Sequence, residues 1–147
     1  AISGPTMPLP RDAAESPHKG HRGVRRLVNA LFFSLSGLAL AFRHESAFRQ
    51  EIALAAVLLP TALLLPVAPA ERVLLAGSVL LVLVVELLNS SVEAAIDRIG
   101  FDTHRLSKRA KDLGSAAVLV ALALLLLTWA MLAGPTLAAW IAPPRPS

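Results

Sequence analysis

Three long stretches of this chain consist almost entirely of hydrophobic residues, and charged or turn-forming residues separate them. Charged residues are absent over 19 positions from Ile52 to Ala70, over 13 from Val73 to Val85 and over 32 from Leu113 to Pro144. A helix needs about 20 mostly apolar residues to cross the hydrocarbon core of a bilayer. The pattern therefore predicts three transmembrane helices, over residues 47–65, 71–99 and 108–133.

Residues 23–43 follow a different pattern, in which apolar residues recur at intervals of three or four. The recurring residues are Leu27, Leu31, Leu35, Leu38 and Phe42. This spacing forms one stripe along a helix, and three arginines (Arg22, Arg25 and Arg26) cluster at its start. We expect an amphipathic helix on the membrane surface. The alternative is a partly buried fourth helix of the bundle.

The expected fold is an all-α membrane protein, with an N-terminal amphipathic surface helix followed by three transmembrane helices. Residues 22–135 form its single membrane domain. Residues 1–21 are polar and rich in Pro and Gly, which is typical of a disordered tail, and residues 1–6 precede Met7 and are candidates for a cloning remnant. Residues 136–147 are expected to form a short C-terminal tail.

Composition agrees with a membrane protein, and the placement of charge orients it. Hydrophobic residues make up 55% of the chain and charged residues 16%, below the roughly 25% usual in soluble domains. Of the 14 Lys and Arg residues, seven lie at or before Arg49 and five between Arg98 and Lys111. The positive-inside rule places the N-terminus and the second loop in the cytoplasm, with the C-terminus outside. Because the basic residues mark this orientation, a nucleic-acid partner is the weaker interpretation.

Acidic residues form a row on the second predicted transmembrane helix, between Val84 and Gly100. At about 100° per residue, Glu93 and Asp97 lie some 20° to either side of Glu86, and Asn89 about 60° away. An acid at mid-bilayer costs roughly 2.5–3.5 kcal/mol, so such residues commonly have a function. The alternative is a polar seam that pairs with Arg or Lys of a neighbouring helix. For Asp97 the two interpretations have equal weight.

Two further polar sets lie at the same membrane depth if neighbouring helices are antiparallel. Near the first transmembrane helix, Glu45 and Arg49 have the spacing of an ion pair, whereas Glu51 has no local partner. Lys108, Arg109 and Lys111 open the third, and Lys108 and Arg109 resemble an ordinary basic flank. Carboxylates suit Mg²⁺, lysines suit phosphate, and a further carboxylate could activate a hydroxyl group. Together these are the parts for phosphoryl transfer, although the chain has neither a P-loop nor a kinase Gly-rich loop.

Three motifs then carry a resemblance to a known family: ESAFRQE, ELLNSSVEAAIDRI and RAKDLGSAAV. Together and in this order, they closely resemble the prokaryotic diacylglycerol kinase family of small trimeric membrane kinases. The resemblance covers roughly residues 26–132.

The resemblance implies transfer of the ATP γ-phosphate to the primary hydroxyl of diacylglycerol, giving phosphatidic acid at the cytoplasmic face of a bacterial inner membrane. It implies Mg²⁺ as cofactor and a homotrimer whose active sites are shared between subunits. It makes Glu86 the catalytic base and Glu45 and Glu93 the metal ligands. The residues matching ATP- and phosphate-binding positions are Arg26, Asn89, Asp102, Thr103, His104, Lys111 and Asp112. Glu51 and Ser115 match positions that line the lipid site.

Two other functions are compatible with the sequence. An undecaprenol kinase of the same family would keep the chemistry and change the lipid. A small cation transporter or channel subunit would use the acids as an ion path. A continuous path needs polar groups at all depths, whereas the outer half of each predicted transmembrane helix lacks charge, apart from Glu71 and Arg72 at the outer end of the second.

Overall fold

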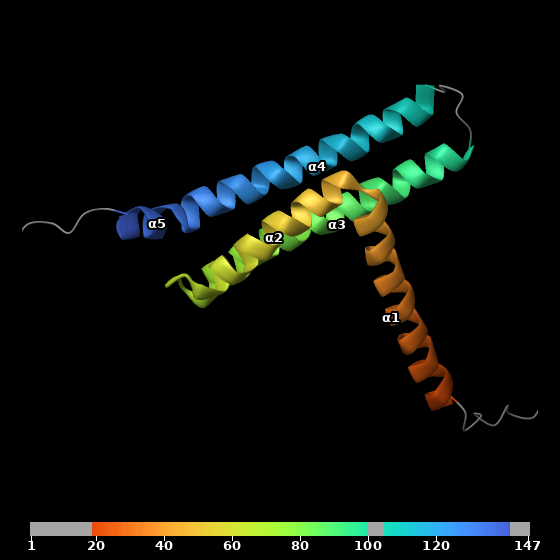
Figure 1. Cartoon of the computed structure of the whole chain (residues 1–147), viewed down its shortest axis with the longest axis horizontal. Helices are drawn as coiled ribbons and strands as arrows, with labels where there is room; N and C mark the ends of the chain where they lie inside the picture. Colours follow the sequence, from red (N-terminus) through yellow and green to blue (C-terminus); the bar gives the residue numbers. More distant parts are fainter. Residues whose placement is uncertain (1–18, 100–104, 142–147) are drawn as a thin grey trace, which may run out of the picture. The chain divides into compact units, whose positions relative to one another are not determined.

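The computed structural model describes residues 19–99 and 105–141, which are helical apart from Glu45, Ala133 and the connection at residues 65–68 (Figure 1). The helices are α1 (Lys19–His44), α2 (Ser46–Leu64), α3 (Pro69–Ile99), α4 (Arg105–Leu132) and α5 (Gly134–Ile141). The expected all-α fold is confirmed. Helix α5 occupies residues that the sequence analysis divided between the end of the membrane domain, at residue 135, and the C-terminal tail of residues 136–147.

Four of the described helices are long and apolar enough to cross a membrane. These segments are Gly23–His44, Ser46–Leu64, Pro69–Arg98 and Arg105–Leu132. Large apolar side chains are exposed along them, as expected where lipid or another subunit replaces water as the neighbour. Helix α1 meets the same criteria as the other three, so its expected position on the membrane surface stays a prediction.

The boundary between two compact units falls within α1, after Gly37. In the first unit, the apolar side chains of the predicted stripe, such as Leu27 and Leu31, are exposed. The second unit begins at Leu38 and contains α2 to α5. The candidate site described below lies entirely within this second unit.

Helix α3 is the central element of the second unit, because it packs against both α2 and α4 (Figure 1). Two buried apolar clusters hold these helices together. The first consists of Ala55, Val79, Val82, Ala121 and Leu125, and the second of Ala62, Leu65, Leu75 and Ala133. The alanines allow the helices to approach closely, as small residues commonly do between membrane helices.

Side chains of α3 hold the turn between α2 and α3 in place. The carboxylate of Glu71 accepts a hydrogen bond of 2.8 Å from the backbone N–H of Ala68, which is one half of a capping box. The guanidinium of Arg72 donates to the carbonyl of Leu65 at 3.2 Å. At the same end of the bundle, the indole N–H of Trp129 donates to the carbonyl of Leu75 at 3.3 Å. These bonds hold the end of the bundle opposite the acidic row.

Candidate active site

Glu45 occupies the single non-helical position between α1 and α2. It is the N-cap of α2, with extended backbone angles (φ −103°, ψ 115°), and its side chain makes no capping hydrogen bond. A carboxylate beside a helix N-terminus is favoured by the partial positive charge there. Because the Glu45 carboxylate makes no capping hydrogen bond, it can face the space beside α3.

The acidic row of α3 faces this space. Glu86 is only 4% exposed, while Asn89 and Glu93 are half-buried on the turns that follow. The side-chain amide of Asn89 donates to a Glu93 carboxylate oxygen at 3.3 Å. Asn89 thus orients Glu93, and the helical spacing predicted from the sequence gathers these three side chains on one face.

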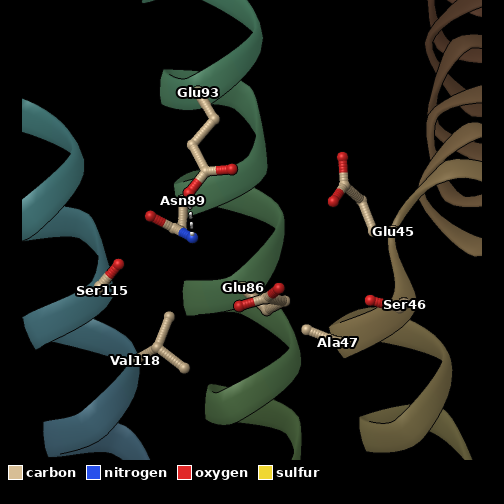
Figure 2. A pocket seen from close by; sticks show the side chains of 8 residues that line it. All are labelled: Glu45, Ser46, Ala47, Glu86, Asn89, Glu93, Ser115 and Val118. Atoms are coloured by element: carbon tan, nitrogen blue, oxygen red, sulfur yellow. Dashed lines mark hydrogen bonds between the residues drawn. The ribbon is translucent and has the colours of Figure 1, made fainter. Parts of the chain in front are cut away.

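A pocket of about 280 Å³ lies between α2, α3 and α4 and brings the polar residues together (Figure 2). It is lined by Glu45, Ser46, Ala47, Glu86, Asn89, Glu93, Ser115 and Val118. Glu45 approaches from the start of α2, Glu86 and Glu93 from α3, and Ser115 from α4 (Figure 2). Three carboxylates, an amide and two hydroxyls therefore share one cavity within a membrane-embedded bundle.

Close approach of α4 to α3 at Gly114 fixes the position of Asn89. A Cβ atom placed on Gly114 would lie 3.2 Å from Cγ of Asn89 and closer still to its Oδ1. Oδ1 is buried and has no hydrogen-bond partner among the described residues. Only glycine leaves room for the amide here, so Gly114 is part of the structure that holds Asn89 against Glu93.

Lys111 lies outside the lining of the pocket and pairs with Asp97 across α3 and α4. Its Nζ is 2.6 Å from Asp97 Oδ1. Asp112 lies beside it on an exposed surface, 4.0 Å from Lys108 in an i, i+4 pair. For Asp97, the structure supports the interpretation that it belongs to a polar seam between helices, because its partner is a lysine of the neighbouring helix.

Of the remaining predicted site residues, Glu51 does not line the pocket. Glu51 is half-buried on α2, and its Oε2 is buried without a hydrogen-bond partner in the described part of the chain. Arg26 is exposed on the part of α1 that belongs to the first unit. Asp102, Thr103 and His104 lie outside the described residues.

The proposed Glu45–Arg49 pairing is wrong. Instead, the Arg49 guanidinium donates to the carbonyls of Phe42 and Arg43, both at 3.3 Å. These carbonyls belong to the last turn of α1, where cations are favoured. Arg49 therefore caps α1 and is not paired with the Glu45 carboxylate.

Sequence reasoning did not identify Ser46, Ala47, Val118 and Gly114 as part of the site. Ser46 and Ala47 directly follow Glu45, and Val118 lies one turn after Ser115. Their spacing could have indicated the first three. The role of Gly114 depends on the distance between two helices, which the local sequence does not specify.

The comparison with known proteins decides the family. Residues 32–133 match the family model described as prokaryotic diacylglycerol kinase, which is well over half of the chain. The chain belongs to the prokaryotic diacylglycerol kinase family. The match includes every residue that lines the pocket.

Several bacterial relatives carry the name diacylglycerol kinase. The protein of that name from Pseudomonas aeruginosa is 51% identical over 115 residues, covering 78% of this chain and 94% of the relative. The Escherichia coli protein is 47% identical over 110 residues, covering 75% and 90% respectively. The Haemophilus influenzae protein is 48% identical over 107 residues, covering 73% and 91%. The similarity therefore extends over nearly the whole length of each relative.

The pocket of this family member has ligands suited to a divalent cation, although it does not form a closed metal cage. Among the described residues, no three acidic or histidine side chains lie close enough together to hold a metal ion by themselves. Mg²⁺ usually keeps several waters and binds through one or two carboxylates together with substrate phosphates. Glu45, at the start of α2, and Glu93, on α3, both line the pocket (Figure 2), and their carboxylates suit a cation of this kind.

Proposed function

We propose that this protein phosphorylates the primary hydroxyl group of diacylglycerol with the γ-phosphate of ATP, giving phosphatidic acid and ADP. The observation that carries this proposal is the burial of Glu86 in a membrane-crossing helix, at a pocket that also contains Glu45 and Glu93. A buried acid in such a helix commonly has a function. The names of the relatives supply the substrate.

Glu86 acts as the general base in the proposed mechanism. The hydroxyl oxygen of diacylglycerol attacks the γ-phosphorus, and the bond from that phosphorus to the β,γ-bridging oxygen breaks. Glu86 accepts the hydroxyl proton as the new P–O bond forms, and ADP carries away the bonding electrons. The burial of Glu86 limits competing attack by water, because the base is accessible to a lipid hydroxyl and poorly accessible to bulk solvent.

Glu45 and Glu93 would hold Mg²⁺, with Asn89 keeping Glu93 oriented through its 3.3 Å hydrogen bond. When bound, Mg²⁺ neutralises charge on the phosphate oxygens. Lys111 supplies a second positive charge for the transferred phosphoryl group. Glu51 and Ser115 contact the lipid in this proposal, since each comes from a helix that borders the Glu86 face.

The nucleotide is bound from the cytoplasmic side, by Asn89, Lys111 and Asp112 together with four further residues. Those residues are Arg26, Asp102, Thr103 and His104. A homotrimer with active sites shared between subunits, which the resemblance to the family implies, is part of the proposal. The protein would lie in the bacterial inner membrane with its N-terminus in the cytoplasm and its C-terminus outside.

Transfer of radioactive phosphate from ATP to a lipid by the purified protein tests this function. In matched detergent micelles, diacylglycerol should be labelled and undecaprenol should be labelled far more slowly. Faster labelling of undecaprenol would move the protein to that branch of the family. Labelling of neither lipid, with ion conduction in liposomes, would replace the kinase proposal with a transporter.

A further inference from the structure

Asp97 is the one member of the α3 acidic row that does not line the pocket, and the mechanism above gives it no role. It lies four residues after Glu93, so it continues the same helix face one turn further along. Lys111 lies four residues before Ser115, one turn from the pocket along α4. The Asp97–Lys111 pair therefore joins α3 and α4 one turn beyond the pocket, on the side toward the chain connection between them.

We propose that Asp97 is a positioning residue for Lys111, holding its ammonium group where the phosphates of the nucleotide bind. This inference rests on the proposed function, because it assigns Lys111 to those phosphates. The contact of 2.6 Å between Lys111 Nζ and Asp97 Oδ1 is short even for a charge-assisted hydrogen bond.

The pair leaves Lys111 able to bind phosphate. An ammonium group has three N–H donors, and Asp97 uses one of them, so two remain for phosphate oxygens. A lysine side chain is flexible, and ordering it on binding has an entropic cost. Because Asp97 already orders Lys111 before the nucleotide arrives, that cost does not oppose nucleotide binding.

Asp97 also keeps Lys111 away from Glu93. The two carboxylates lie one turn apart on α3, so a lysine released from Asp97 can reach Glu93 instead. Such a pairing would occupy the carboxylate that Asn89 holds at the pocket. The Lys108–Asp112 pair differs in distance and placement, because it lies within one helix with its atoms 4.0 Å apart. The Asp97–Lys111 pair joins two helices at 2.6 Å, with the side chains 56% and 40% exposed respectively. Long, exposed i, i+4 pairs contribute little.

Nucleotide binding tests the inference without depending on turnover. The full-length protein in lipid nanodiscs is titrated calorimetrically with the Mg²⁺ complex of a non-hydrolysable ATP analogue. Asp97→Asn keeps the shape and removes the charge, and we expect the Kd to rise about three- to tenfold, the equivalent of one hydrogen bond of ordinary net strength. Asp97→Glu should restore the Kd to within about twofold of the unmodified protein.

Two further variants separate positioning from other effects. Arg98→Gln changes one charge at the neighbouring exposed position and should leave the Kd unchanged. In a Lys111→Gln background, Asp97→Asn should cause no further loss, because its effect passes through Lys111. Helical circular dichroism establishes that each variant is folded.

The inference is overturned if Asp97→Asn binds the analogue as well as the unmodified protein does, or more tightly, since tighter binding would mean that Asp97 competes with phosphate for Lys111. An equal loss in the presence and absence of Lys111 would also overturn it. These results differ from failure of the proposed function, in which the unmodified protein labels no diacylglycerol. If the unmodified protein binds no analogue, both proposals fail.

Discussion

Addition of a single methyl group at Gly114, which lies against Asn89, is the smallest substitution that should disturb the site. A methyl group on Gly114 would meet the Asn89 side chain, and the amide would move away from Glu93. We expect Gly114→Ala to lower kcat/KM by at least about tenfold and to destabilise the fold by about 1–3 kcal/mol, the usual cost of overpacking. Steady-state kinetics and thermal unfolding in detergent measure the two effects.

Gly77 provides the matched control for this substitution. It is also helical and lies on α3, but nothing lies within 4 Å of the Cβ that alanine would add. Gly77→Ala should leave activity unchanged and stabilise the helix slightly, because alanine is the better helix former. Equal activity of the Gly114→Ala and Gly77→Ala variants would show that Asn89 does not need its observed position.

At the residue scale, periodicity predicted which side chains share a face, because the helical repeat is fixed. Glu86, Asn89 and Glu93 do lie together at the pocket. The partners of Arg49 and Asn89 were not predictable in this way. Arg49 contacts carbonyls at the end of the preceding helix, and Asn89 meets a glycine of another helix. Both contacts depend on where chain segments lie in space.

At the scale of single elements, α3 depends on its N-terminal cap for part of its stability. Glu71→Ala removes the acceptor of the 2.8 Å hydrogen bond from Ala68. The expected loss is about 0.5–2 kcal/mol, as for other helix caps, and it should appear as a lower Tm in detergent. Activity should stay within about twofold of the unmodified protein, because Glu71 lies about 22 Å from Glu86 along the helix at 1.5 Å per residue. Reduced activity at an unchanged Tm would contradict this assignment.

The helices themselves were largely predictable, since stretches without charge can be read directly from the sequence. The first predicted transmembrane helix, 47–65, differs by one residue at each end from α2 (Ser46–Leu64). The predicted helices 23–43 and 47–65 also leave the break at Glu45 between them, and the predicted end at residue 133 directly precedes α5. The sequence analysis did not predict that residues 134–141 form a helix. The break at Glu45 matters for the site, because the Glu45 carboxylate there makes no capping hydrogen bond and can line the pocket.

At the scale of the whole molecule, the number of membrane crossings distinguishes a surface position of α1 from a fourth transmembrane helix. The chain contains no cysteine, so single introduced cysteines report which side each position faces. With three transmembrane helices, a cysteine at Ala68 should react with a membrane-impermeant maleimide from outside, and one at Ser107 only after permeabilisation.

Cysteines at Gly23 and His44 test α1 itself, because these residues lie at the two ends of the candidate segment. If α1 lies on the cytoplasmic surface, both should be labelled only after permeabilisation. Labelling of the two positions from opposite sides would show that α1 crosses the membrane, which would contradict the surface-helix prediction.

The central claim is that Glu86 removes the hydroxyl proton of the lipid, and the Glu86→Gln variant tests it most directly. Glutamine keeps the size of the side chain but cannot act as the base. The measurement is the single-turnover rate of phosphate transfer from ATP to diacylglycerol, together with the Kd of the ATP analogue. We predict a rate about 10²–10⁴ times lower, the usual contribution of a general base, with an unchanged Kd. A Glu86→Gln variant that transfers phosphate at the unmodified rate would contradict the account.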